Sequence, residues 1–261
     1  MLYYGGKIMR ELRFFVPLSN LKGDTITIDG QEFRHLHKVL RLDVGDEVFV
    51  ICNDDNIRRC RLTKIGKDFA LAQVLETIVK QHDGLDITVF QALIKSEPLS
   101  YAVQKCTELD VKTFVPFISQ YTVVEDKGQV QSRLQRIALA SCKQCGRLCT
   151  MEISQSLEFK EMCNRLKDYA QVIVAYENDV TNAKKILSQL NKRDKIAVVI
   201  GGEGGFSEAE INQLRALTNV HFVSLGRLIL RAETAVVALV SAIKYELGEF
   251  TNESSDVDTG M

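Results

Sequence analysis

From residue 85 onward the chain alternates apolar strands with amphipathic helices, and this alternation constrains the fold more than any other feature of the sequence. We expect strands at residues 87–93, 114–118, 171–176, 195–200 and 221–225. We expect helices at residues 98–109, 129–146, 157–168, 181–190, 207–217 and 233–247. Near-continuous Val and Ile in strands that alternate with helices predict a parallel sheet covered by helices on both faces.

The first 80 residues have a different pattern. Short apolar or alternating runs, separated by turn residues, predict strands at residues 25–28, 47–51, 60–65 and 69–75, with one helix at residues 32–40. Close spacing of short strands favours a small β-barrel. The sequence therefore predicts an α/β chain of two domains, joined by a linker at residues 81–84 and followed by a disordered acidic tail at residues 249–261.

Two glycine-bearing turns follow late strands of the predicted sheet. Four glycines occupy five consecutive positions, 201–205, and Gly226 follows the last strand. Glycine lets the backbone adopt positive φ and lets a ligand approach the main chain closely. Ser207 and Glu210 have the spacing of a capping box, so the first turn leads directly into a helix N-terminus, where backbone N–H groups could hold a small polar ligand. We expect the two turns on neighbouring strand ends, where parallel sheets bind ligands.

The glycine pattern does not match the common nucleotide-binding motifs. A dinucleotide fold places G-x-G-x-x-G after its first strand, whereas this cluster comes late and reads G-G-E-G-G-F. A phosphate-binding loop needs G-K-[ST], and no Lys follows the cluster. The simple alternative for each turn is a structural role: a tight turn, and an ordinary acidic first turn of a core helix.

The distribution of charge permits an RNA partner without requiring one. The formal net charge is −1, but residues 246–261 hold five acids and no Lys or Arg, so removing them leaves +4 for residues 1–245. Basic side chains such as Arg58, Arg59 and Arg61 could follow phosphates. Equally, they could belong to a solvated face of the barrel.

Cysteine usage and the lack of targeting signals indicate a cytoplasmic protein. The seven cysteines are an odd number without the spacing of a secreted disulfide framework, so we expect reduced thiols. Cys142, Cys145 and Cys149 have a spacing that lines one helix face, and no second ligand pair follows, so we expect no metal. We see no signal peptide and no apolar run long enough to span a membrane, and we expect no membrane partner.

Taken together, the two glycine-bearing segments resemble the signature of the SPOUT RNA methyltransferases, and within them the ribosomal RNA small-subunit methyltransferase E family. That family carries G-P-E-G-G-F/[LW]-[ST] and L-G-x-R-I-L-R-x-E-T-A, and here residues 201–207 read GGEGGFS and residues 225–235 read LGRLILRAETA. Further similarities are RFF at residues 13–15, HLHKVLRL at residues 35–42, QKCTELDV at residues 104–111 and QCGR at residues 144–147. The chain departs from the family pattern at Gly202 (usually Pro), Leu228 (usually Arg), Ser96-Glu97 (usually Gly-Asp) and Asp110 (usually Gly).

The resemblance implies a fold and an activity. It implies a PUA-like β-barrel for RNA at residues 1–80 and a SPOUT methyltransferase domain at residues 84–248, tied in a trefoil knot. It also implies transfer of a methyl group from S-adenosylmethionine to N3 of a uridine in 16S ribosomal RNA, by a homodimer acting on the RNA or on the small ribosomal subunit. N3 lies on the pairing edge of uracil, so the base must be unpaired or extruded and must lose its proton.

The resemblance also suggests roles for particular residues. Arg231, Glu233 and Arg13 would serve catalysis, with Arg13 possible as the group that stabilises the uridine anion. RNA would be bound by Arg13, Arg34, Lys38, Arg41 and Arg147. The cofactor would be held by Tyr176, Glu177, Ile200, Gly201, Glu203, Gly204, Gly205, Leu225, Gly226, Ile229 and Leu230.

Two other classes of protein stay open at this point. One is a non-catalytic RNA-binding or ribosome-assembly factor with the same fold. The other is a nucleotide-dependent α/β oxidoreductase, which the missing glycine fingerprint of the first strand disfavours.

Overall fold

The structure is a computed structural model that describes residues 3–4, 7–8, 12–52, 54, 56–79, 84–124, 128–147, 149–178 and 183–250. The chain forms two compact units. The first comprises Met1–Asp83 and Cys142–Thr150, and the second comprises Gly84–Ser141 and Met151–Met261. None of the helices in the described ranges combines the length and the apolar character needed to cross a membrane. The predicted acidic tail beyond residue 250 and the linker at residues 81–83 lie outside the described residues.

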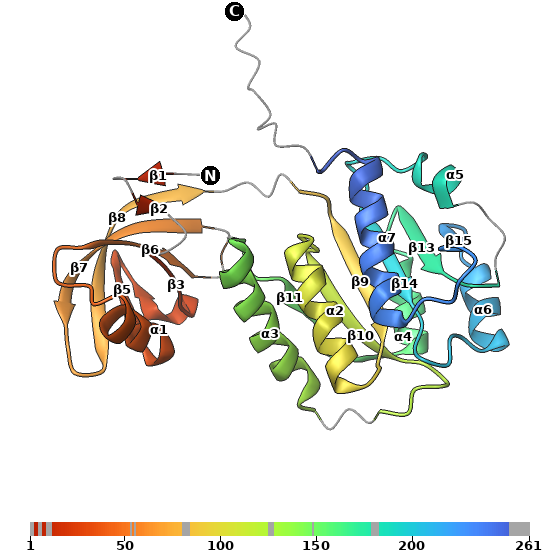
Figure 1. Ribbon diagram of the computed structural model, residues 1–261, viewed down its shortest axis with the longest axis horizontal. Coiled ribbons are helices and arrows are strands. Elements are labelled where there is room, and N and C mark those ends of the chain that lie inside the picture. Colours follow the sequence, from red (N-terminus) through yellow and green to blue (C-terminus); the bar gives the residue numbers. More distant parts are fainter. Residues whose placement is uncertain are drawn as a thin grey trace, which may run out of the picture. The chain divides into compact units, whose positions relative to one another are not determined.

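The second unit is built on a seven-stranded sheet in which every pairing is parallel, as the alternation predicted (Figure 1). Its order is β11-β10-β9-β14-β13-β15, and β12 also pairs with β10. The strands are β9 (Ile87–Ala92), β10 (Thr113–Ile118), β11 (Glu152–Ile153), β12 (Leu157–Glu158), β13 (Gln171–Ala175), β14 (Ile196–Ile200) and β15 (Val220–Val223).

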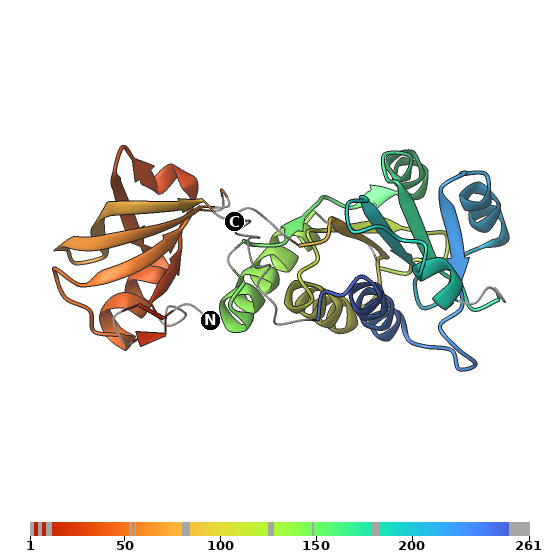
Figure 2. The same ribbon diagram turned by 90° about the horizontal axis from the view of Figure 1, so that it is seen from above.

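Helices cover both faces of this sheet (Figure 2). Helices α2 (Ser96–Glu108), α5 (Ala183–Leu187) and α7 (Ala232–Glu246) share one core with part of α3 (Val130–Cys145), whereas α4 (Phe159–Leu166) and α6 (Glu208–Arg215) belong to a core on the other face. Neighbouring strand residues alternate between the two cores, as Val89 and Phe90 do on β9. Both faces of the strands are therefore buried, which explains their continuous apolar runs.

The predicted helices and main strands of this unit are present, with two corrections. Strands β11 and β12 were missed because two residues are too short to show an alternating pattern. The helix expected from residue 157 begins at Phe159, since Leu157 and Glu158 pair with Phe117 and Ile118 of β10. Asp110, where the family usually has Gly, follows α2 with φ +58°, a conformation that glycine adopts most readily.

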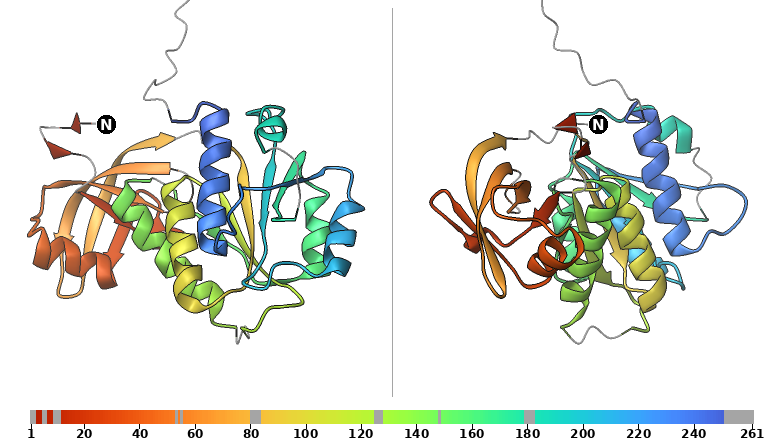
Figure 3. Two further views of the ribbon diagram at one scale, coloured as in Figure 1. Left: turned by 45° about the vertical axis from the view of Figure 1, so that its right-hand side comes forward. Right: turned by 60° about the vertical axis from the view of Figure 1, so that its left-hand side comes forward.

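The first unit is a curled β half-barrel with a six-stranded sheet in the order β3-β6-β7-β8-β5-β4 (Figure 3). The β3–β6 pair is parallel and the others are antiparallel. The strands are β3 (Arg13–Phe15), β4 (Leu21–Lys22), β5 (Thr25–Asp29), β6 (Glu47–Ile51), β7 (Asn56–Ile65) and β8 (Phe69–Val79), with a short 3₁₀ helix at Leu18–Asn20. Strands β1 (Tyr3–Tyr4) and β2 (Lys7–Ile8) pair only with each other among the described strands.

One helical segment packs in the curl of this sheet. The helix expected at residues 32–40 is an α-helix, α1 (Gly30–Arg34), continued by a π-helical turn at His35–Val39. Phe33 and Leu36 are buried with Phe14, Ile28 and Val48 in the core of this unit. The side chains between these buried positions point outward, so this helical segment presents a polar face to solvent.

Candidate functional site

Three strand ends, rather than two, form the candidate site. The expectation that the two glycine-bearing turns lie on neighbouring strand ends is wrong, because β13 lies between β14 and β15 in the sheet. Since all three strands are parallel, their carboxyl ends share one edge. The segment after β13, Tyr176 and Glu177, therefore lies between the glycine turn (residues 201–206) and the second turn (residues 224–230).

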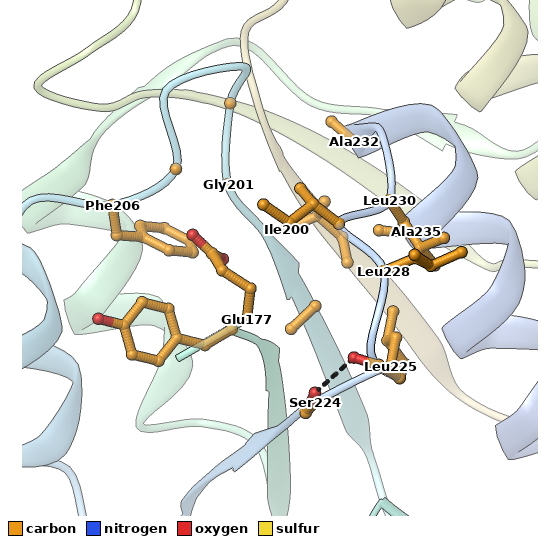
Figure 4. Close-up of a pocket in the computed structure, with 16 residues that line it drawn as sticks. Glu177, Ile200, Gly201, Phe206, Ser224, Leu225, Leu228, Leu230, Ala232 and Ala235 are labelled. Atoms are coloured by element: carbon orange, nitrogen blue, oxygen red, sulfur yellow. Dashed lines mark hydrogen bonds between the residues drawn. The ribbon is translucent and has the colours of Figure 1, made fainter. Parts of the chain in front are cut away.

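These three segments and the start of α7 surround one pocket of about 550 Å³, a volume that includes the solvent at its mouth (Figure 4). We call it the strand-end pocket. Its lining residues are Ala175, Tyr176, Glu177, Ile200, Gly201, Gly202, Gly205, Phe206, Ser224, Leu225, Gly226, Leu228, Ile229, Leu230, Ala232 and Ala235.

The glycine turn has no room for side chains at its key positions. The Gly205 N–H donates to the Gly202 carbonyl at 3.0 Å, and Gly205 has φ +67°. A Cβ atom on Gly201 would lie 3.1 Å from Phe206 Cε2 and 3.3 Å from Gly205 Cα. The turn therefore presents its backbone to the pocket, as a close approach between a ligand and the main chain requires.

The second turn combines backbone with exposed apolar side chains. Gly226 has φ +123°, and the Ser224 hydroxyl donates to the Gly226 carbonyl at 3.2 Å (Figure 4). Leu228 and Ile229 line the pocket although they are 81% and 85% exposed. These two side chains give the edge of the pocket an apolar surface.

Two residues that the sequence did not single out hold the glycine turn in place. Phe206 packs against Phe117 and Phe159 on the α4 side of the sheet. Gln91 is fully buried, and its Nε2 donates to the Gly201 carbonyl at 3.1 Å. The sequence does mark Gln91 as a polar residue inside an otherwise apolar strand. Such a residue is worth noting because a buried amide needs hydrogen-bond partners.

The capping box predicted at the start of α6 is confirmed. The Ser207 hydroxyl accepts from the Glu210 N–H at 3.3 Å, and the Glu210 carboxylate accepts from the Ser207 N–H at 2.8 Å. The lining of the pocket ends at Phe206. The glycine turn itself, rather than the helix N-terminus that we expected, thus provides the backbone facing the pocket.

Glu177 provides the negative charge of the pocket, since among its described lining residues no other is ionisable except Tyr176. Its Oε1 lies 3.5 Å from the position of a Cβ atom on Gly205, so the carboxylate faces the glycine turn. The pocket thus combines backbone groups and apolar side chains with a single carboxylate, a combination that suits a ligand with apolar surface and a cationic or hydroxyl group.

The tip of the glycine turn, Glu203 and Gly204, lies outside this lining. Glu203 Oε2 is 3.5 Å from Lys95 Nζ, and both side chains are exposed. The other residues predicted to hold a cofactor, Tyr176, Glu177, Ile200, Gly201, Gly205, Leu225, Gly226, Ile229 and Leu230, do line the pocket.

The predicted catalytic residues Arg231 and Glu233 lie at the start of α7. Arg231 is its N-cap residue, and its carbonyl accepts from the N–H groups of Thr234 and Ala235 at 2.9 and 2.8 Å. Neither of the two predicted catalytic residues is part of the pocket lining, but their neighbours Leu230, Ala232 and Ala235 are. Arg231 is exposed.

Arg13, the third predicted catalytic residue, is placed in the first unit and is buried. Its Nη1 donates to the Gly146 carbonyl at 2.7 Å. Lys143, in the last turn of α3, pairs with the buried Glu32 and lies over the Phe15 ring. Arg147, a predicted RNA contact, is half-buried in the same segment. The segment Cys142–Thr150 is therefore fixed to the half-barrel by Arg13 and Glu32.

The other predicted RNA contacts form an exposed group on the half-barrel. Arg34 and Lys38 lie on α1 and the π-helical turn, and Arg41 follows with φ +52°. All three are exposed, and the described residues include no ion-pair partner for them. We call them the cationic face, and their charge is available to an external anion.

The arginines of β7 are arranged differently. Arg58 forms a two-point pair with Asp54, at 2.9 and 2.5 Å. Arg59 pairs with Glu47 and Glu76, and Arg61 pairs with Glu47. The Arg61 and Arg59 guanidinium groups lower the pKa of Glu47, and Arg58 lowers that of Asp54. Of the two interpretations of these arginines, a solvated and internally paired face fits better than a phosphate track.

The cysteines that suggested a cluster do not share a single helix face. Cys142 and Cys145 lie on α3, but Cys149 follows the end of this helix. Cys142 is buried, its thiol donates to the carbonyls of Arg147 and Cys149, and burial raises its pKa to about 12. Among the described residues no three His, Cys, Asp or Glu side chains are grouped so that they could hold a metal ion.

Comparison with known proteins gives consistent matches over both units. Residues 81–244 match the family model of an RNA methyltransferase domain, and residues 28–75 match that of an RNA methyltransferase PUA domain. The chain is 31% identical over 248 residues to ribosomal RNA small subunit methyltransferase E of Bacillus subtilis, covering 90% of this chain and 96% of the relative. It is 25% identical over 245 residues to the protein of that name from Buchnera aphidicola, covering 92% and 96%.

Solved structures agree with these matches. A crystal structure of a ribosomal RNA small subunit methyltransferase E from Neisseria gonorrhoeae, bound to S-adenosyl methionine, superposes with a TM-score of 0.78 at 27% identity. The match covers 92% of this chain and 99% of that one. A probable rRNA-methyltransferase from Porphyromonas gingivalis, at 22% identity and a TM-score of 0.80, shares the fold.

Proposed function

The chain belongs to the ribosomal RNA small subunit methyltransferase E family, and on this premise we propose that it transfers the methyl group of S-adenosylmethionine to N3 of a uridine in 16S ribosomal RNA. The observation that carries the proposal is the strand-end pocket, in which the ends of three adjacent parallel strands converge and which is lined by backbone and apolar side chains. Ligands of open parallel sheets bind at this edge.

The residues of the pocket fit the methyl donor. Main-chain groups of the glycine turn and the second turn suit the polar groups of a nucleoside, and Leu225, Ile229 and Leu230 provide apolar surface for its base. Glu177 can accept hydrogen bonds from ribose hydroxyls or pair with a cationic group. We assign cofactor binding to these residues, with Tyr176, Ile200, Gly201, Gly205 and Gly226.

When bound, S-adenosylmethionine supplies a methyl carbon on a sulfonium, to which N3 of uracil forms a bond as the carbon–sulfur bond breaks. The protein must align N3 with that carbon and stabilise the charge left when N3 loses its proton. We assign stabilisation of the uracil anion to Arg231, which is exposed at the N-terminus of α7, and positioning of this arginine or of the base to Glu233 in the first turn of α7.

We assign RNA binding to the first unit. The cationic face of Arg34, Lys38 and Arg41 provides positive charge for phosphates. We also assign RNA binding to Arg13 and Arg147. Arg13 donates a hydrogen bond to the Gly146 carbonyl, which favours an indirect role for Arg13: it fixes the backbone next to Arg147. This assignment corresponds to an RNA-binding domain at residues 1–80 and a methyltransferase domain at residues 84–248, except that the segment Cys142–Thr150 with Arg147 belongs to the first unit.

A homodimer is the state that best explains the second turn. Leu228 and Ile229 line the pocket and are nearly fully exposed in a single chain, so a second copy could cover them and close the pocket. The molecular mass in solution, from light scattering with and without Leu228→Glu, tests this. A monomeric wild-type protein with full activity would contradict it.

The decisive experiment is methyl transfer from a radiolabelled donor into small-subunit ribosomal RNA from a strain that lacks this activity, followed by mapping of the modified nucleotide. We expect one uridine to gain a methyl group at N3. Binding of the RNA without transfer would favour the alternative of a non-catalytic assembly factor. Stabilisation by NAD rather than S-adenosylmethionine in a thermal-shift panel would favour an oxidoreductase. A substrate of this kind places the protein in the cytoplasm.

A further inference from the structure

The tip of the glycine turn faces away from the strand-end pocket and toward two other strand ends. In the sheet, β14 is followed by β9 and then β10, so the segments after these three strands share one edge. A Cβ atom on Gly204 would lie 2.9 Å from Tyr121 Cβ, beyond the end of β10. Glu203 is 3.5 Å from Lys95, beyond the end of β9. The tip is therefore flanked by one aromatic ring and one cation.

Tyr121 is exposed although its loop is firmly braced. Its side chain is 49% exposed. The Thr122 N–H donates to the Ser119 carbonyl at 3.0 Å, and the Ser119 N–H donates to Thr122 Oγ1 at 2.9 Å. The Gln120 N–H donates to Glu210 Oε1 at 2.8 Å, which ties the loop to the capping box of α6. A pre-ordered aromatic ring at the surface loses little conformational entropy when a ligand stacks on it.

Lys95 adds a positive charge at the same place. Its side chain is 70% exposed and that of Glu203 is 47% exposed. An exposed pair at this separation is weak, so Lys95 can exchange Glu203 for an anionic group of a ligand. An aromatic face with an adjacent cation matches an unpaired nucleobase with its phosphate.

We propose that Tyr121 is the stacking platform for the unpaired target base, held at the tip of the glycine turn with Lys95 at its side. This inference rests on the proposed methyltransferase function, because a uracil whose N3 reacts must leave its pair and needs a surface to replace the lost stacking. The platform lies beside the turn that lines the strand-end pocket, so a base stacked there is next to the methyl donor's site.

The test uses the full-length protein and small ribosomal subunits that lack the modification. Tyr121→Ala keeps the Cβ atom, which is the Tyr121 atom that a side chain on Gly204 would meet first, so the turn should keep its shape. We expect the KM for the subunits to rise about tenfold, the typical effect of removing one stacking aromatic, with unchanged affinity for S-adenosylmethionine by calorimetry. Tyr121→Phe should behave as the wild type. The matched control is Tyr101→Ala on α2, whose side chain is 47% exposed, and it should leave the KM unchanged.

A fluorescence measurement gives an independent readout, because the chain contains no tryptophan. Tyr121→Trp introduces a single reporter, which small-subunit ribosomal RNA should quench by stacking, and Tyr101→Trp should not be quenched. The proposal is overturned if Tyr121→Ala methylates with the wild-type KM, if both tryptophans are quenched alike, or if Tyr121→Ala loses donor affinity, which would show a structural role. Failure of the wild type to transfer a methyl group would instead overturn the proposed function on which the inference rests.

Discussion

The strand-end pocket and the cationic face have opposite chemistry, and the proposed function assigns them different ligands. The pocket is lined by glycine backbone and apolar side chains with one carboxylate, whereas the cationic face consists of three exposed basic side chains. Recognition by the main chain requires that a ligand can approach the glycine backbone closely. A methyl group added at a glycine blocks this approach. Recognition by charge depends on unpaired cations, so salt and the loss of charge disturb it. The comparison therefore predicts that a side chain added to the glycine turn should weaken cofactor binding, and that loss of charge from the cationic face should weaken RNA binding.

The largest effect is expected from a side chain in the glycine turn. Gly204→Val places a Cβ atom 2.9 Å from Tyr121 Cβ and forces the tip to move. Overpacking of this kind costs about 1–3 kcal/mol, or roughly five- to a hundredfold in affinity for S-adenosylmethionine by calorimetry. The wild type is the reference for this measurement. Wild-type affinity in Gly204→Val would show that the turn does not hold the cofactor.

The next largest effect is expected from the cationic face. Arg34→Ala, Lys38→Ala and Arg41→Ala together should lower RNA affinity about tenfold at moderate salt and reduce the slope of log affinity against log salt by about 2–3. Affinity for S-adenosylmethionine should not change. Filter binding across a salt series measures this.

The control for this prediction is Arg59→Gln with Arg61→Gln, which removes arginines already paired with Glu47 and Glu76. A salt slope that falls as much in this control as in the cationic-face variant would mean that the whole half-barrel, and not this face, attracts RNA.

A smaller effect is expected at the one carboxylate of the pocket. Glu177→Gln keeps the shape of the side chain and removes its charge, which should weaken binding of the cationic donor by about 1 kcal/mol, or roughly fivefold. Glu208→Gln, an exposed first-turn residue of α6 outside the pocket lining, should leave affinity unchanged. If both variants bind the donor equally well, Glu177 makes no direct contact with it.

The smallest effect is expected for two buried cysteines, which belong neither to the strand-end pocket nor to the cationic face. Burial raises the pKa of Cys60 and Cys142 to about 12, from 9.0, so both thiols stay protonated at neutral pH. The native protein should resist alkylation at these two positions, and denaturant should abolish the resistance, as peptide mass mapping can show. Because the unfolded thiols ionise near pH 9 and the native ones do not, stability should fall as pH rises from about 9 to 12.

The sequence predicts the pocket well where function depends on the backbone. The glycines at positions 201, 205 and 226 are visible in the sequence, and all three lie in the lining. Gly205 and Gly226 have positive φ, which glycine adopts most readily, whereas a Cβ atom on Gly201 would crowd Phe206. The contribution of Phe206 and Gln91 was missed, since their importance comes from contacts with Phe117 and Gly201 that are formed only in the folded sheet. Strand order cannot be deduced from local pattern, so the position of β13 between the two turns was not foreseen.

Charged residues were harder to interpret for a related reason. Arg41 and Arg59 look alike in the sequence, and only tertiary pairing with Glu47 and Glu76 distinguishes the second from the first. The same holds for Arg13, whose partner Gly146 is 133 residues away. The trefoil knot came from the family resemblance alone and stays a prediction.

The attachment of Cys142–Thr150 to the half-barrel means that the first unit is not a contiguous piece of sequence. A fragment that stops near residue 80 would leave the buried Glu32 without Lys143 and Arg13 without the Gly146 carbonyl. An uncompensated buried carboxylate is strongly destabilising. We therefore expect that the half-barrel cannot be transferred alone between proteins. An engineered or evolutionary transplant must carry the end of α3 with it, and a mutation in that distant segment should destabilise the first unit.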